Sequence, residues 1–197
     1  RVGSPEAPRC AVVGSARGPH SHGARIDAAD RVYRVDGTPT RGYEALVGSR
    51  TDVRIFSRHT VATASGGSNS QYGCGGPTRC VLIREYGDLN ATSGAVARIT
   101  TDRWAKILLA DEDFTRYALT FKSQFTATPP KRITLSAGLA TALYALSQCS
   151  SVEVFRVGAN GTCCGAGLRF YNSTAPRTSH RFSEQAAWAA LPVTFVA

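Results

Sequence analysis

The chain has 197 residues, of which 43% are hydrophobic, so it is long and apolar enough for one domain with a sizeable core. No stretch reaches the roughly 18 continuous apolar residues of a membrane span. The net charge of +9 is dispersed, without a run of five basic residues, which argues against a nucleic-acid-binding segment. We expect an unstructured lead-in over residues 1–9 and a single domain over residues 10–197.

The first half of the chain contains short apolar runs that are typical of buried strands. Residues 10–14, Cys-Ala-Val-Val-Gly, are too short for a helix and predict the first strand. Gly14 would let the backbone turn sharply and leave amides open toward a ligand phosphate. Residues 31–35 alternate polar and apolar positions and predict a second strand, and residues 52–56 predict a third. The Ser- and Gly-rich residues 57–80 predict a long loop.

The second half alternates strand and helix patterns. Ser136 is a good N-cap for the helix that we expect next. The patterns predict a strand at 80–84, helical periodicity over 101–126, a helix over 138–149, a strand at 152–157 and a final helix from about 183 through 188. This alternation predicts an α/β protein, a three-layer α/β/α sandwich of Rossmann type with a mostly parallel sheet.

Four segments, in order, resemble the motifs of the eukaryotic sialyltransferase family. Residues 10–56 are similar to the large sialylmotif, which has the Cys-Ala-Val-Val-Gly strand, an Ile-Asp pair and an Arg-containing turn ending in Pro-Thr. Residues 135–158 are similar to the small motif, Arg169-Phe-Tyr-Asn172 to the third motif, and Ser179-His-Arg-Phe-Ser-Glu184 to the very small motif. The ordered set covers nearly the whole chain from residue 10.

The resemblance implies a GT-A-like fold and an inverting glycosyltransferase. Such an enzyme moves sialic acid, or a related ulosonic acid such as Kdo, from a CMP-sugar to a glycan hydroxyl. It implies that His180 is the general base, because an imidazole that titrates near neutrality can take the acceptor proton. Glu184 either orients that imidazole or stabilises the following helix start. The family needs no metal and no cofactor besides the donor.

The resemblance also implies a donor-binding set, composed of Gly14, Ser15, Asp36, Ser136, Ala137, Gly138, Gly158, Arg169 and Tyr171. Three of these positions depart from the family pattern. Ser15 and Asp36 stand where the family usually has Asn, and Arg169 stands where it has His. An ionised Asp36 either repels the donor phosphate or faces the ribose hydroxyls. These departures keep open the alternative of a catalytically silent relative that still binds a nucleotide or glycan.

The six cysteines and the sequons at Asn90, Asn160 and Asn172 fit a secretory lumen. The resemblance implies a Cys10–Cys149 disulfide, a Golgi location, a glycoprotein or glycolipid acceptor, and a membrane anchor upstream of this chain. Cys74 and Cys80 could close a local loop. The sequence leaves the pairing of Cys163 and Cys164 open.

One acidic cluster suggests different chemistry. Asp111-Glu-Asp113 resembles the Asp-x-Asp of glycosyltransferases that bind Mn²⁺ or Mg²⁺ against a UDP diphosphate. A CMP-sugar has one phosphate, and we therefore interpret the cluster as an exposed acidic helix end and predict no metal site.

Overall fold

The computed structural model describes residues 7–56, 79–82, 107–109, 112–125, 135–157 and 184–196. The described elements are β1 (Arg9–Val13), α1 (Gly23–Asp27), β2 (Arg31–Val35), α2 (Glu44–Val47), β3 (Val53–Phe56), β4 (Arg79–Leu82), β5 (Ile107–Leu109), α5 (Glu112–Ser123), α6 (Ala137–Leu146), β6 (Ser151–Phe155), α7 (Gln185–Ala189) and β7 (Thr194–Val196).

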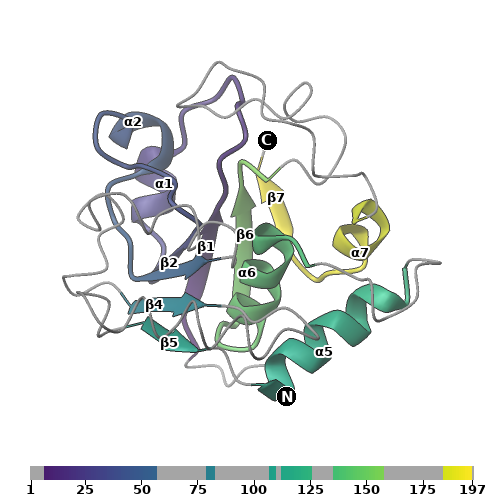
Figure 1. Ribbon diagram of the computed structural model, residues 1–197. Helices are drawn as coiled ribbons and strands as arrows, with labels where there is room; N and C mark the ends of the chain where they lie inside the picture. The colour runs from purple at the N-terminus through teal and green to yellow at the C-terminus, as the bar shows by residue number, and fades with distance from the viewer. Residues whose placement is uncertain are drawn as a thin grey trace.

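The described strands form one seven-stranded sheet in the order β5-β4-β3-β2-β1-β6-β7. All six neighbouring pairs are parallel. The last four residues of β1 and β2 and all of β3 are buried, as expected for strands of a parallel sheet that is covered on both faces, and the buried residues include Arg34 and Arg54. Figure 1 shows β1 and β6 at the centre of the molecule.

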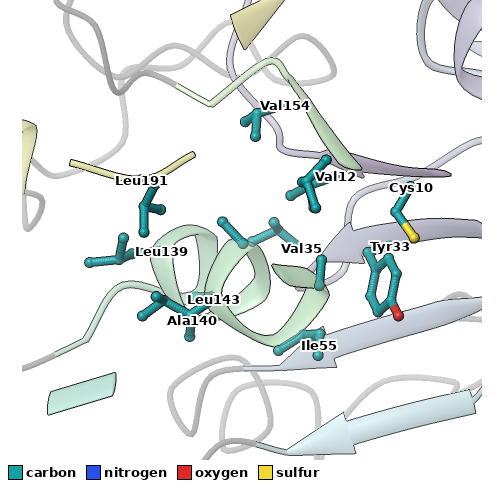
Figure 2. Close-up of a cluster of buried hydrophobic side chains, with 14 of the residues drawn as sticks. Cys10, Val12, Tyr33, Val35, Ile55, Leu139, Ala140, Leu143, Val154 and Leu191 are labelled. Atoms are coloured by element: carbon teal, nitrogen blue, oxygen red, sulfur yellow. The ribbon is translucent and has the colours of Figure 1, made fainter. Parts of the chain in front are cut away.

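One face of the sheet carries α5, α6 and α7. Four strands each contribute a side chain that points toward α6, namely Val12, Val35, Ile55 and Val154 (Figure 2). On the helix they face Leu139, Ala140 and Leu143, and Leu191 belongs to the same buried cluster. Small alanines fill much of α6, which lets the helix pack closely on the strands beneath it.

The other face carries the short helices α1 and α2. Alternate strand residues, among them Val13 and Val32, pack there against Ile26 of α1 and Val47 of α2. Arg34 of β2 is fully buried on this side, and its guanidinium donates to the carbonyls of Val47, Gly48 and Arg50. Burial lowers the pKa of Arg34 to about 10.

The three-layer α/β/α sandwich and the parallel sheet are confirmed, and the strands expected at 31–35, 52–56 and 152–157 are present within two residues of their predicted bounds. The region 101–126 differs, because it contains the edge strand β5 as well as helix α5. Strand β7, at the other edge, was not predicted.

The lead-in expected over residues 1–9 is ordered from Ala7 onward. Arg9 begins β1, and the carbonyl of Pro8 accepts a hydrogen bond from the amide of Ser150 at 3.0 Å. Residues 1–6 lie outside the described part of the chain. Among the described helices, none is long and apolar enough to cross a membrane.

Candidate active site at the carboxyl ends of β1 and β6

The candidate site lies where the strand order reverses. β2 to β5 extend the sheet on one side of β1, whereas β6 and β7 extend it on the other. In open α/β sheets, ligands bind at such a point, outside the carboxyl ends of the two central strands. Gly14 and Ser15 follow β1, and Arg156 and Val157 follow β6, so segments of the large and small motifs meet here.

Gly14 is required by a close approach between these two chain segments. A Cβ at this position would lie 2.4 Å from the carbonyl oxygen of Arg156 and 2.8 Å from Cγ2 of Val157. The amide of Gly14 donates to the carbonyl of Phe155 at 2.9 Å, and the amide of Ala16 donates to the carbonyl of Arg156 at 2.8 Å. Both amides are therefore engaged by the chain segment at the end of β6, so the amide of Gly14 is not open toward a ligand as the sequence suggests, and Ser15 between them is half-buried.

Asp36 directly follows β2 and has a left-handed backbone conformation, φ = 50°. Asp and Asn tolerate this conformation better than other residues with a Cβ. Its amide donates to the carbonyl of Ile55 at 2.8 Å, and its carbonyl accepts from the buried guanidinium of Arg54 at 2.6 Å. The backbone of Asp36 is thus fixed by β3, at the same edge of the sheet as Gly14.

The N-terminus of α6 lies at this edge as well. Oγ of Ser136 accepts from the amide of Leu139 at 3.2 Å, as an N-cap does, and confirms the predicted cap. Within the described part of the chain, the amides of Ala137 and Gly138 have no hydrogen-bond partner. The Cβ position of Gly138 lies 3.5 Å from Cγ1 of Val157, so Gly14 and Gly138 contact the same valine.

Glu184 joins three helices through one carboxylate. It accepts from the amide of Ser136 at 2.9 Å and from the hydroxyl of the same residue. Nζ of Lys122, near the end of α5, donates to it at 2.6 Å. The two charged side chains are only 7% and 14% exposed, so this ion pair is largely buried. The carboxylate thus holds the start of α6 and the start of α7 together.

The structure brings together Gly14, Ser15, Asp36 and the start of α6, with Glu184 beside it. His180, Gly158, Arg169 and Tyr171 lie outside the described residues. Sequence reasoning missed two contributors, Lys122 and Arg156. Neither belongs to a spacing pattern that could have identified it, because their partners lie far away in the sequence.

The acidic cluster shows no metal-binding arrangement where it is described. Asp113 is exposed and pairs with Arg116 at 3.7 Å, whereas Asp111 lies outside the described residues. Over the described ranges, no group of three His, Cys, Asp or Glu side chains could hold a metal ion.

The comparison with family models identifies a class of glycosyltransferase. The model of glycosyltransferase family 29 (sialyltransferase) matches residues 2–186, and the chain belongs to this family. It is similar to the rat beta-galactoside alpha-2,6-sialyltransferase 2, with 47% identity over 58 residues, which are 28% of this chain and 11% of that protein.

Solved structures share the fold. A mammalian sialyltransferase crystal structure aligns over 96% of this chain and 69% of its own, with a TM-score of 0.67 and 20% identity. The complex of a mammalian sialyltransferase with Gal-beta-1-3GalNAc-ortho-nitrophenol aligns over the same shares, with a TM-score of 0.63 and 20% identity.

Proposed function

We propose that this chain is an inverting sialyltransferase that moves sialic acid from CMP-sialic acid to a hydroxyl of a glycan. The observation that carries the proposal is a contact between the two motifs. Gly14 of the large motif lies against Val157 of the small motif, at the point where the strand order reverses. A nucleotide bound there would contact residues from both motifs at once. We place the enzyme in the Golgi lumen, as a family member acting on a glycoprotein or glycolipid.

The donor phosphate would bind at the start of α6. The amides of Ala137 and Gly138 remain for an anion, and the helix dipole favours negative charge there. The carboxylate of Glu184 would oppose such an anion, but Lys122 neutralises it at 2.6 Å. Ser15, Gly14 and Asp36 at the neighbouring strand ends would contact the nucleotide. Gly158 directly follows Val157 and joins the same set.

His180 would act as the base in the transfer. As the acceptor oxygen attacks the anomeric carbon, the bond from that carbon to the phosphate oxygen breaks, and CMP leaves with the electron pair. The imidazole takes the proton of the acceptor hydroxyl. His180 precedes Glu184 by four residues, and so few residues span at most about 14 Å of chain. The anchored Glu184 therefore sets an upper limit on the distance between His180 and the α6 terminus.

Calorimetric titration tests the donor assignment. CMP should bind more tightly than UDP or GDP, and EDTA should not weaken it, because one phosphate needs no metal. Arg169→Ala should cost about 1.5–3 kcal/mol of CMP binding, which is typical of a lost hydrogen bond to a charged group. A preference for UDP that depends on Mn²⁺ would instead move the site to Asp111 and Asp113.

The role of His180 predicts a split between binding and turnover. His180→Ala should lower kcat roughly 10²- to 10⁴-fold, the usual contribution of a general base, while the Kd of CMP changes little. If the unaltered chain is active and His180→Ala has the same kcat, the mechanism is overturned. If the unaltered chain binds CMP but transfers no sugar, it is instead a catalytically silent relative of these enzymes.

A further inference from the structure

Arg156, the residue that follows β6, has an unusual backbone and an unusual side chain. Arg156 has φ = 52°, in the left-handed region that disfavours residues with a Cβ. Its side chain is only 5% exposed, and burial lowers the pKa of its guanidinium. A residue in this conformation is retained where the surrounding structure holds it, and such positions cluster at functional sites.

The guanidinium of Arg156 binds the loop that follows β1. Nη1 donates to the carbonyls of Ala16 and Gly18, each at 3.3 Å, and Nη2 donates to the carbonyl of His20. The main chain adds a further contact, because the carbonyl of Arg156 accepts from the amide of Ala16 at 2.8 Å. One residue of the small motif therefore holds a loop of the large motif at three alternate peptide units.

This arrangement orients the peptide units of the loop. The described peptides are all trans, and in a planar trans peptide the N–H points opposite to the C=O. The carbonyls of Ala16 and His20 point at the guanidinium, so the N–H groups of Arg17 and Ser21 point away from it. Arg156 itself is too buried to serve as a ligand for a substrate anion.

We propose that Arg156 is a positioning residue that holds the loop of residues 15–22 in its donor-binding conformation. This inference rests on the donor site proposed above. Arg156 sets how well the loop is ordered before the donor arrives, and so it controls donor affinity. Other residues bind the acceptor and take its proton, so kcat does not depend on Arg156.

Three substitutions separate the guanidinium from the backbone conformation. Arg156→Gly removes the side chain and accepts φ = 52° without strain. Arg156→Lys keeps the charge but not the planar fork that reaches several carbonyls. Arg25→Ala is the matched control, because Arg25 is an exposed arginine of α1 that pairs with Glu153 of β6 at 2.6 Å. It removes the same charge from an exposed position whose guanidinium makes no hydrogen bond to the loop.

The measurements are the Kd of CMP, the KM of the CMP-sugar against kcat, and hydrogen exchange of the amides of residues 16–22. We expect Arg156→Gly to raise Kd and KM about tenfold or more, which corresponds to about 1.4 kcal/mol, with kcat changed less than about twofold. Loop exchange should accelerate, Arg156→Lys should recover part of both effects, and Arg25→Ala should match the unaltered chain.

Unchanged loop exchange in Arg156→Gly would overturn the inference, and so would faster exchange with an unchanged Kd. A fall in kcat alone would also contradict it. If the unaltered chain does not bind CMP at all, the proposed function fails, whereas the exchange measurement still decides whether Arg156 orders the loop.

Discussion

Asp36 shows how a residue that departs from a family pattern can be explained by its backbone. The sequence suggested a carboxylate that either repels phosphate or contacts ribose. The structure adds that the position has φ = 50° and that its amide and carbonyl are both engaged by β3. Asp and Asn both suit this conformation, so the backbone requirement is met by either residue.

Substitution at Asp36 should follow this backbone requirement. Asp36→Ala should lower the free energy of unfolding by about 1 kcal/mol, because alanine is strained in the left-handed region. Asp36→Gly should be about 1 kcal/mol more stable than Asp36→Ala, since glycine adopts this φ freely. Urea denaturation checks the order. Equal stability of the two variants would show that the conformation is not what selects the residue.

Asp27 provides a pH-dependent contribution to stability. Partial burial raises the pKa of its carboxyl, but hydrogen bonds from the amides of Ser49 and Arg50 outweigh burial, and the net pKa lies below its usual value of 3.8. A carboxyl whose pKa is lowered by folding stabilises the protein above its unfolded pKa. That contribution is lost as the pH falls through the folded pKa.

Comparison of the unaltered chain with Asp27→Asn isolates the contribution of the Asp27 carboxylate to the free energy of unfolding. The difference in unfolding free energy should be constant near neutral pH and should shrink as the pH is lowered below about 4. The same comparison at the exposed Asp113, as Asp113→Asn, provides a control for the general effect of acid. A difference that grows below that pH would contradict the assignment.

At the scale of elements, Lys122, Glu184 and Ser136 connect α5, α7 and α6. Glu184→Gln would remove the carboxylate charge that pairs with the largely buried ammonium of Lys122, and we expect a loss of about 3 kcal/mol. The double variant Lys122→Met with Glu184→Gln should recover at least half of that loss. Urea denaturation of the unaltered chain, the two single variants Lys122→Met and Glu184→Gln, and the double variant gives the coupling energy, expected at about 1–3 kcal/mol.

The exposed pair on the same helix is the control. Asp113 and Arg116 are 86% and 63% exposed and 3.7 Å apart. Their double-mutant cycle should give a coupling energy of about 0–0.5 kcal/mol, because solvent screens the two charges. If both cycles gave the same coupling, burial would not be what makes the Lys122–Glu184 pair strong.

The sequence predicts the central elements better than the edges and the side-chain networks. β1 could be predicted because its apolar run is typical of a buried parallel strand, β2 and β6 because they are rich in valine and aromatic residues, and α6 because Ser136 caps an alanine-rich run. The three-residue strands β5 and β7 depend on a neighbouring strand for their hydrogen bonds, and no local pattern encodes that partner.

Some residues of the candidate site could be predicted from the sequence, and others could not. Gly14, Ser15 and Ser136 follow from motif spacing, whereas Lys122 and Glu184 are 62 residues apart and Arg156 meets its loop across 136 to 140 residues. Such contacts join residues that are far apart in the sequence, so local sequence patterns do not contain them. The loop contacts of Arg156 also depend on a backbone conformation that its residue type does not suggest.

At the scale of the whole molecule, the disulfide Cys10–Cys149 joins β1 to the connection between α6 and β6. It closes a loop with a sequence separation of 139, and in the chain-entropy model such a link contributes about 5 kcal/mol. Non-reduced digests should yield a peptide pair containing both cysteines. The double variant Cys10→Ala with Cys149→Ala should unfold at correspondingly lower urea concentration.

Free thiols at both positions, in protein from a secretory host, would contradict this pairing. The double variant removes both thiols together and so avoids leaving an unpaired cysteine in the core. Its comparison with the reduced form of the unaltered chain separates the loss of the cross-link from the loss of the two sulfur atoms.

The account as a whole rests on transfer of a sugar from a CMP donor. The most direct measurement incubates the purified chain with CMP-sialic acid and a β-galactoside acceptor in EDTA and quantifies sialylated product and CMP by mass spectrometry. The account predicts product and CMP in equal amounts, formed without added metal. CMP-sialic acid that remains intact while the chain binds CMP, or a product that forms only with UDP-sugars and Mn²⁺, would contradict it.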